Sequence, residues 1–530
     1  MTELMQRILP TVQKPARYTG GEWGEIKKDL KDVRVRVAFC FPDTYEIGMS
    51  NLGMRILYGV MNGMDGVWCE RVFAPWGDME QAMRDNSLPL WALESQTPVR
   101  EFDMIAFTIG YEMAYSNILN MLNLAGVPLR SKDRQGLKNI VFAGGVCAFN
   151  PEPLADFIDF FSLGEGEDIT VEILQLYDRA KAEGWSKDAF LHEAAKIPGV
   201  YVPGFYRHEY NADGTLAAIV PLEGVPQTVT KRIIEDLDNA YFPTKMIVPS
   251  TEIVHDRANL EVFRGCIRGC RFCQAGFSCR PVRRKSPEVL YRQAVESLAD
   301  SGNHELTLAS LSTSDYRGLK ELTDALIPYC MEQKVNLSVP SLRADNFSRE
   351  LMEKLQTVRK SGLTFAPEAG TQRLRDVINK NVTQEDLLQS CRTAFAGGYN
   401  AVKLYFMLGL PTETDEDVLG IADLAARVMH TWRESASNKN RGVRITVSTS
   451  WFVPKPHTAF QWEPQISKEE YERLKQYEEL DEIKQIVDQY YYQEPDDQGM
   501  LDGAAMGLLY GLDDPYTFYY TPENYAKMWA

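Results

Sequence analysis

Short apolar runs alternate with amphipathic stretches through most of this chain, and that alternation limits the folds open to it. In the first region, helical stretches such as SNLGMRILYGVMN separate the runs VRVAFCF, DMIAFTI, KNIVFAGG and FIDFFSLGEGED. Strands that are apolar on both faces are typical of buried parallel sheets with helices on either side. We therefore predict an α/β, doubly wound, Rossmann-like domain over residues 20–200.

The carboxyl ends of these predicted strands hold turn-forming residues, and open parallel sheets bind ligands at that edge. The segments concerned are residues 42–45, Thr108, residues 144–145 and residues 164–167. Glycines there permit tight turns and close backbone approach. The pattern is compatible both with a ligand site and with ordinary strand-to-helix turns, and both interpretations stay open.

A second alternating region follows an irregular stretch. Residues 201–249 contain several prolines and the strand-like piece AAIVPL, so we predict a linker with a small β element there. Residues 250–465 contain six further apolar runs: ANLEVFR, ELTLAS, VNLSVP, GLTFAP, AVKLYFML and RITVSTS. Six strand–helix units of this spacing favour a (β/α)6 partial TIM barrel, which carries its chemistry at the carboxyl ends of its strands.

The chain is acidic, with 57 basic and 74 acidic residues and a formal net charge of −17. Because non-specific nucleic-acid binding depends on clustered Lys and Arg, this balance argues against a surface broadly devoted to phosphate backbones. The densest positive stretch is RPVRRK, residues 280–285. It predicts either a solvated or anion-facing loop or a local contact with RNA, and the substrate stays unidentified.

The chain shows neither a signal peptide nor a run of about 18 uncharged apolar residues, so we expect a cytoplasmic protein with no membrane partner. Nine cysteines in 530 residues are too few for a disulfide scaffold, and a reducing cytosol keeps them as thiols. A cluster of cysteines in such a chain indicates metal or redox chemistry.

Three of the cysteines, Cys266, Cys270 and Cys273, form a C-x3-C-x2-C motif directly after the first predicted barrel strand. Metal centres rich in thiolates usually take four ligands, so three cysteines leave one position open for something else. The alternative is completion by Cys279 or His255, which would give a structural zinc site or an electron-transfer cluster.

This motif, with an aromatic residue just before its third cysteine, resembles the signature of the radical S-adenosylmethionine (SAM) superfamily, and the six-strand pattern resembles that superfamily's barrel. The resemblance implies an enzyme whose [4Fe–4S] cluster is held by the three cysteines and whose fourth iron binds SAM. Reduction of the cluster, by a reductant of the flavodoxin or ferredoxin type, then cleaves SAM and starts hydrogen abstraction or methylation. The SAM contacts that the resemblance implies are Phe272, Arg343, Glu368, Gly370 and Arg373.

Each charged SAM contact has an ordinary structural alternative. Glu368 precedes a helical stretch, where a carboxylate favours the helix dipole with or without a ligand. Arg343 and Arg373 could clamp the SAM carboxylate, but the commoner use of an arginine is a surface ion pair. A non-catalytic iron–sulfur or zinc-binding protein is the alternative to the enzyme, and reductive cleavage of SAM distinguishes the two.

Residues 20–470 as a whole resemble a bacterial family of radical SAM proteins with an N-terminal cobalamin (B12)-binding-like domain. Many corrinoid domains ligate cobalt with the histidine of a D-x-H-x-x-G loop. The first histidine of this chain is His192, well beyond the early strands. A corrinoid would therefore bind without a histidine ligand, or the domain has kept the fold and lost the cofactor.

The last segment has another character. Residues 477–530, and above all GLDDPYTFYYTPE, resemble the N-terminal helical segment of carboxy-terminal processing proteases. No nucleophilic serine or catalytic lysine follows, so we do not expect protease activity. We interpret the segment as a helical tail fused from another family, natural or artefactual, with a helical cap on the barrel as the alternative.

Overall fold

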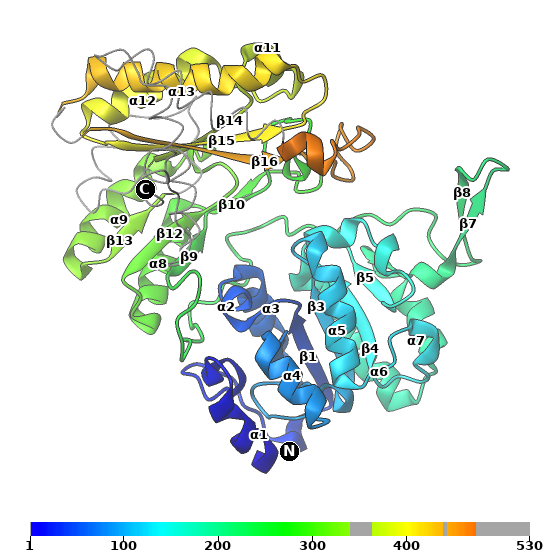
Figure 1. Cartoon of the computed structure of the whole chain (residues 1–530). Helices are drawn as coiled ribbons and strands as arrows, with labels where there is room; N and C mark the ends of the chain where they lie inside the picture. The colour runs from blue at the N-terminus through cyan, green and yellow to red at the C-terminus, as the bar shows by residue number, and fades with distance from the viewer. Residues whose placement is uncertain (1, 340–362, 438–441, 473–530) are drawn as a thin grey trace, which may run out of the picture. The chain divides into compact units, whose positions relative to one another are not determined.

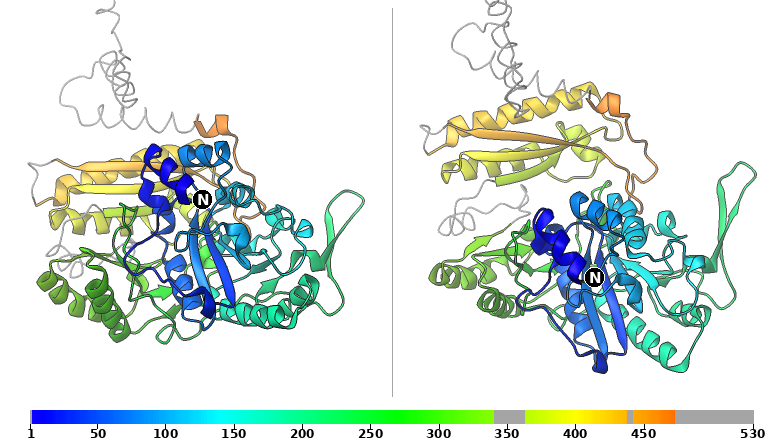
Figure 2. Two further views of the ribbon diagram at one scale, coloured as in Figure 1. Left: turned by 90° about the horizontal axis from the view of Figure 1, so that it is seen from below. Right: turned by 60° about the horizontal axis from the view of Figure 1, so that its bottom comes forward.

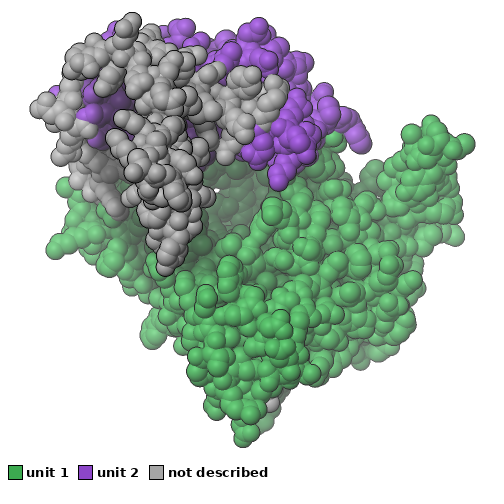
Figure 3. Space-filling model, in the orientation of Figure 1, with its two compact units in different colours: residues 1–361, 455–461 green, residues 362–454, 462–530 purple. Residues whose placement is uncertain are grey.

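The computed structural model describes residues 2–339, 363–437 and 442–472. Two compact units make up the chain (Figure 3): residues 1–361 with 455–461, and residues 362–454 with 462–530. The first unit contains the N-terminal sheet and three of the six expected barrel strands, and the second unit contains the other three. Within the described ranges, no helix is both long enough and apolar enough to cross a membrane.

The N-terminal sheet is built from six strands: β1 (Val35–Phe41), β2 (Val67–Phe73), β3 (Met104–Thr108), β4 (Ile140–Gly144), β5 (Phe160–Ser162) and β6 (Val200–Tyr201). Their order is β2-β1-β3-β4-β5-β6, and all neighbours pair in parallel except β5 with β6. The chain builds β2 on one side of β1 and β3 on the other, so the topological switch point lies between β1 and β3. This confirms the predicted doubly wound α/β architecture.

Strand β2 was not predicted from the sequence. Its sequence VWCERVF carries Glu70 and Arg71 in the middle, yet all seven residues are buried. Arg36 of β1 pairs with Glu70 at 2.5 Å, while Arg71 pairs with Glu94 at 2.6 Å and with Glu22 at 2.5 Å. Buried charges persist when they are paired, so tertiary partners rather than an apolar pattern make this strand possible.

Helices cover both faces of the N-terminal sheet (Figures 1 and 2). One face carries α2 (Tyr45–Gly48), α3 (Leu52–Asn62), α6 (Gly166–Glu183) and α7 (Lys187–Ala194). The other face carries α1 (Thr2–Ile8), α4 (Gly77–Asp85) and α5 (Tyr115–Ala125). The strands therefore bury apolar side chains on both faces, which accounts for their continuous apolar runs.

A hairpin of β7 (Tyr206–Tyr210) and β8 (Leu216–Pro221) follows the N-terminal sheet in the chain and projects from the first unit (Figure 1). It lies in the predicted linker, and β8 contains most of the strand-like piece AAIVPL. Most of its residues are exposed, so the hairpin adds little to the apolar core.

The barrel strands of the first unit are β9 (Ala258–Glu261), β12 (Glu305–Ala309) and β13 (Asn336–Ser338), which form a parallel sheet. Leu260, Leu306 and Leu322 are buried where this sheet packs against α8 (Pro287–Ser301) and α9 (Leu319–Gln333). Between β9 and α8 in the chain, β10 (Phe263–Arg264) pairs antiparallel with β11 (Arg283–Arg284). This short pairing closes the loop that holds the cysteine motif.

The second unit contains three parallel strands: β14 (Leu363–Glu368), β15 (Ala401–Leu408) and β16 (Arg444–Trp451). Its helices are α11 (Gln372–Val377), α12 (Gln384–Ala396) and α13 (Asp415–Ser435). All six barrel strands predicted from the sequence are therefore present. Along β15, the buried Leu404 and Phe406 alternate with the less buried Lys403 and Tyr405, as expected for a sheet that packs on helices with one face.

Candidate functional site

The three motif cysteines lie on one loop, residues 265–282, which we call the cysteine loop. The pairing of β10 with β11 closes its base. Gly265 has a φ of +90°, a left-handed conformation that favours glycine, and a Cβ there would come within 2.6 Å of the backbone oxygen of Cys279. The two ends of the loop are therefore in contact.

Hydrogen bonds fold the cysteine loop onto itself. The backbone N–H of Cys273 donates to the oxygen of Cys270 at 3.2 Å, and the Arg280 guanidinium donates to the backbone oxygen of Arg268 at the same distance. Cys270 is buried, whereas Cys266 and Cys273 are half-buried. All three are free thiols, so no disulfide prevents them from binding a metal.

The basic stretch of residues 280–285 is used inside the protein. Arg283 donates two hydrogen bonds of 2.6 Å to Glu165, in the turn after β5. Lys285 is 2% exposed and lies 4.2 Å from the ring centre of Phe242, and burial lowers its pKa to about 8. Much of this stretch therefore braces the cysteine loop.

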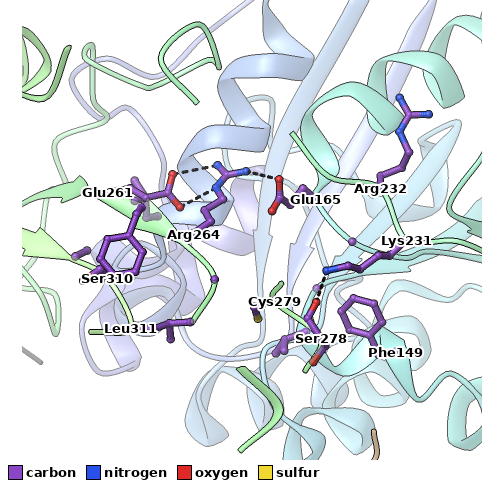
Figure 4. Close-up of a pocket in the computed structure, with 17 residues that line it drawn as sticks. Phe149, Glu165, Lys231, Arg232, Glu261, Arg264, Ser278, Cys279, Ser310 and Leu311 are labelled. Carbon is purple, nitrogen blue, oxygen red and sulfur yellow. Dashed lines mark hydrogen bonds and ion pairs between the residues drawn. The ribbon is translucent and has the colours of Figure 1, made fainter. Parts of the chain in front are cut away.

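A cavity of about 350 Å³, which we call the edge cavity, lies between the carboxyl edge of the N-terminal sheet and the cysteine loop (Figure 4). The turns after β4 and β5 border it on one side, and the ends of β9 and β12 border it on the other. Its wall is mostly apolar, with side chains such as Leu52, Val146, Phe149 and Leu311. The cysteine loop contributes Gly265, Ser278 and Cys279.

A second cavity of about 150 Å³, the inner cavity, lies under the carboxyl ends of β1, β3 and β4 and is lined by α3 and α6. Gly145 and Gly164 line both cavities, so the two adjoin there. A Cβ on Gly145, whose φ is +102°, would lie 2.7 Å from the backbone oxygen of Ile109. Two of the predicted glycine turns thus border these cavities. None of the described residues that line the two cavities is a histidine.

The two carboxylates that line the edge cavity, Glu165 and Glu261, are both paired with Arg264. Arg264 contacts Glu261 at 2.9 Å, Glu167 at 2.6 Å and Glu165 at 3.2 Å. Burial raises the pKa of Glu165, but hydrogen bonds from Arg283 and from a backbone N–H outweigh it and hold that pKa below its ordinary value. The Glu165 carboxylate therefore stays ionised, with Arg264 and Arg283 beside it.

Among the residues that the structure describes, no three His, Cys, Asp or Glu side chains are placed to hold a single metal ion. A [4Fe–4S] cluster makes a different demand, because its cysteines ligate different irons. Three free thiols on one closed loop supply the donor chemistry of such a cluster. Burial raises the pKa of the Cys279 thiol, and the nearby Cys273 and Cys266 add to this, although Lys231 acts in the opposite direction. Because the thiolate is the form that binds a metal, this shift does not favour Cys279 as a ligand, and its completion of the site stays the alternative prediction.

Three predicted SAM contacts lie in the second unit, at the end of β14 and the start of α11. Glu368 pairs with Lys380 at 3.0 Å, and Arg373 pairs with Asp417. A Cβ on Gly370 would clash with the backbone of α13, so close packing requires glycine there. All three have structural roles, and their contacts with SAM stay predictions.

The other predicted SAM contacts lie elsewhere. Phe272 is half-buried on the cysteine loop, and its contact with SAM also stays a prediction. Arg343 lies outside the described residues, as does the predicted helical tail of residues 477–530.

Sequence reasoning missed two cations that organise the site. Arg264 precedes Cys266 by two residues, and that position was the signal available for it. Lys231, in the predicted linker, donates to the backbone oxygens of Ser278, at 2.6 Å, and Arg280. No local pattern marks Lys231, because its partners lie more than forty residues along the chain.

Three family models match this chain. The model described as radical SAM proteins, N-terminal, matches residues 53–203, and the radical SAM superfamily model matches residues 260–425. A radical SAM domain implies a [4Fe–4S] cluster, SAM and a source of electrons. The model of the activating protease CtpB N-terminal domain matches residues 447–524, which confirms the predicted resemblance of the tail and begins it within β16.

Two curated relatives illustrate the range of similarity. The uncharacterized protein MJ0966 of Methanocaldococcus jannaschii is 28% identical over 433 residues, 81% of this chain and 79% of that protein. The threonylcarbamoyladenosine tRNA methylthiotransferase MtaB of Bacillus subtilis is 25% identical over 209 residues, 38% of this chain and 44% of that enzyme. The match thus spans less than half the length of the methylthiotransferase.

Solved structures share the fold. The radical SAM methyltransferase TsrM of Kitasatospora setae, solved with cobalamin and a [4Fe–4S] cluster, has a TM-score of 0.54 at 14% identity, over 81% of this chain and 74% of that one. The cobalamin-dependent SAM radical enzyme OxsB, solved in its apo form, has a TM-score of 0.51 at 13% identity, over 90% of this chain and 66% of that one. Because its N-terminal and core regions both match radical SAM domains, the chain belongs to the radical SAM superfamily and is an enzyme.

Proposed function

We propose that this enzyme holds a [4Fe–4S] cluster on Cys266, Cys270 and Cys273 and a corrinoid in the two adjoining cavities, and uses both to methylate an unidentified substrate. The observation that carries the proposal is the two-part cavity. A broad space beside the cysteine loop continues, at Gly145 and Gly164, into a narrower space between the sheet and its helices.

The residues around these cavities fit a corrinoid, which has a broad macrocycle that carries methyl groups and amide side chains, and a nucleotide arm. The edge cavity offers Val146 and Phe149 to the macrocycle, and the inner cavity offers the hydroxyls of Thr108 and Thr170 to the arm. The inner cavity also lies at the switch point between β1 and β3, where doubly wound sheets of this strand order bind ligands.

The absence of histidine from the cavity walls determines how a corrinoid would bind. None of the described lining residues is a histidine, so a corrinoid in these cavities would take no imidazole ligand from them. Both TsrM, which was solved with cobalamin bound, and OxsB, which is cobalamin-dependent, share the fold. Because their identity to this chain is low, they support the proposal at the level of fold.

The chain's own residues have defined tasks in this scheme. The three cysteines hold three irons and leave the fourth open for SAM. When bound, the cluster supplies the electron that cleaves SAM, and the corrinoid supplies a methyl carrier. The apolar wall of the edge cavity excludes water from the reacting atoms, while Lys231 and Arg280 hold the backbone of the cysteine loop.

The proposal also concerns partners. A flavodoxin- or ferredoxin-type donor would reduce the cluster, which suits a reducing compartment such as the cytoplasm. The names of several relatives place their activity on tRNA. In this chain Arg283 and Lys285 are committed to internal contacts, so no observation favours RNA over another substrate.

Anaerobic purification followed by reconstitution with iron, sulfide and hydroxocobalamin tests the proposal. We expect one [4Fe–4S] cluster and one corrinoid per chain, measured by metal analysis and visible absorption, together with reductive cleavage of SAM. Gly53 borders the inner cavity, and a Cβ there would lie 3.2 Å from Asn51 Oδ1. Gly53→Leu should narrow the cavity and weaken corrinoid binding, while Gly53→Ala, which makes the same contact with Asn51, serves as its matched control.

Two results would contradict the proposal. Full cluster content and SAM cleavage without any retained corrinoid would make this a radical SAM enzyme with a single cofactor. Equal corrinoid affinity in Gly53→Leu and Gly53→Ala would remove the inner cavity as the site of the nucleotide arm.

A further inference from the structure

We propose that Arg264 is a positioning residue that fixes the cysteine loop relative to the ligand-binding edge of the N-terminal sheet. Through this residue the chain sets the separation between the cluster and the ligand in the edge cavity. The inference rests on the proposed function, because it assigns the cluster to the cysteine loop and the corrinoid to that cavity.

One guanidinium joins three segments of the chain. Its Nε lies 2.9 Å from Glu261 at the end of β9, and its two terminal nitrogens lie 2.6 Å from Glu167 and 3.2 Å from Glu165. Glu165 and Glu167 flank the start of α6, immediately after β5. Arg264 thus connects the strand that leads into the cysteine loop with the turn that borders the edge cavity (Figure 4).

Burial strengthens these contacts, and the shape of the guanidinium fixes their geometry. The Arg264 side chain is 14% exposed, and those of Glu167 and Glu165 are 9% and 19% exposed. Charge-assisted hydrogen bonds are stronger away from water, and the planar fork of an arginine fixes the direction of each partner. Glu165 is also held by Arg283, the residue opposite Arg264 in the β10–β11 pairing. Both strands at the base of the loop are therefore tied to the same carboxylate.

Arg264 acts through the loop and does not bind substrate itself. Each of its three nitrogens faces a carboxylate, so its donors are directed at protein groups. Gly265 and Cys266 follow it directly in the chain, and a shift of Arg264 therefore moves the first thiolate. Such a shift changes the position of the cluster without removing any of its ligands.

A second attachment keeps the cysteine loop in place when Arg264 is changed. Residues 455–461, which we call the strap, contact the loop where the backbone N–H of Phe460 donates to the backbone oxygen of Arg271 at 3.2 Å. The strap also contacts the N-terminal domain, where Lys455 pairs with Glu112 at 2.7 Å. We therefore expect loss of Arg264 to tilt the loop rather than to detach it.

The test uses the reconstituted enzyme with both cofactors and the variant Arg264→Gln. Electron paramagnetic resonance measures the magnetic interaction between the reduced cluster and cob(II)alamin, which falls steeply with their separation. In Arg264→Gln molecules that hold both cofactors, as shown by iron and corrinoid content, we expect a shifted interaction. The control is Arg257→Gln. Arg257 precedes β9, at the end away from Arg264, and pairs with Glu305 of β12 at 3.0 Å, so its loss should leave the interaction unchanged.

Glu167→Gln supplies a second variant, because it removes one partner and leaves Arg264 paired with Glu261 and Glu165. It should shift the interaction in the same direction by a smaller amount. An unchanged interaction in both Arg264→Gln and Glu167→Gln, with both cofactors present, would overturn the inference.

Failure of the proposed function gives a different result: the unmodified enzyme then shows a cluster and no corrinoid signal. In that protein, hydrogen–deuterium exchange at residues 265–282 tests Arg264 independently. Faster exchange in Arg264→Gln than in Arg257→Gln supports the positioning role, and equal exchange in the two variants overturns it.

Discussion

The cysteine loop of the first unit and the loop after β14 in the second, residues 368–373, both follow a barrel strand but use charge differently. Around the cysteine loop, cations such as Arg264 and Lys231 hold the chain in place, and no disulfide ties up the thiols. In the loop after β14, the predicted ligands Glu368 and Arg373 are themselves ion-paired. Glu368 and Arg373 must therefore break an ion pair before they bind a cofactor, whereas the motif cysteines have no disulfide to break.

The largest expected effect concerns the thiols. Cys266→Ala, Cys270→Ala and Cys273→Ala should each abolish the cluster and SAM cleavage, because the loss of one thiolate exposes an iron and removes the cluster as a whole. Iron and sulfide content after anaerobic reconstitution, with 5′-deoxyadenosine formation, measure this. Cys279→Ala is the matched control on the same loop and should keep the cluster. Complete loss of the cluster in Cys279→Ala would favour the four-cysteine alternative.

The next effect concerns Glu413, a partly buried glutamate of the second unit. Glu413, in the turn after β15, accepts a hydrogen bond from the backbone of Gly409 at 2.6 Å, and burial raises its pKa to about 7. A carboxyl whose pKa is raised on folding stabilises the protein below its unfolded pKa, and this stabilisation is lost as pH rises through the folded value. We expect the free energy of unfolding to fall by about 2–3 kcal/mol between about pH 4.5 and 8.

Thermal unfolding across that pH range checks the prediction. Glu413→Gln should flatten the dependence on pH, while Glu416→Gln, at an exposed position in the first turn of α13, should preserve it. An unchanged slope in Glu413→Gln would remove this residue as its source.

A smaller effect is expected for Glu368. Its carboxylate is held by Lys380, so SAM must compete for it, and Glu368→Gln should weaken SAM affinity about tenfold while iron content is retained. Equilibrium binding of SAM to the reconstituted enzyme measures this. Lys380→Gln is the companion variant and should leave SAM affinity equal or higher. Unchanged affinity in Glu368→Gln would give this residue a purely structural role.

The smallest effect is expected for Arg373, whose side chain is 49% exposed. Burial raises the pKa of Asp417, but hydrogen bonds from Arg373 and Thr371 outweigh it and leave that pKa below its ordinary value. This stabilisation is present at neutral pH and is lost as pH falls through the folded pKa. Arg373→Gln should lower stability at pH 7 by about 1 kcal/mol, with a smaller difference in acid. Weaker SAM binding at unchanged stability would instead make Arg373 a SAM clamp.

Much of the fold could be predicted because its signals are local. The apolar runs of β1, β3, β4, β5 and all six barrel strands are short local patterns that are visible in the sequence. β2 could not be predicted in this way, because Glu70 and Arg71 interrupt its apolar pattern. Their partners Arg36 and Glu94 come from other segments and are visible only in the folded chain.

By itself, the sequence determined the cysteine spacing, the strand–helix alternation and the glycines at the strand ends, since these depend on residues close together in the chain. The tertiary structure alone decided that two cavities adjoin at Gly145 and Gly164 and that the basic stretch braces the cysteine loop. It also decided that Glu167 pairs with Arg264 across 97 residues of sequence. The physical reason is that ion pairs and cavity walls form between segments that folding brings together, and no local period in the sequence records those contacts.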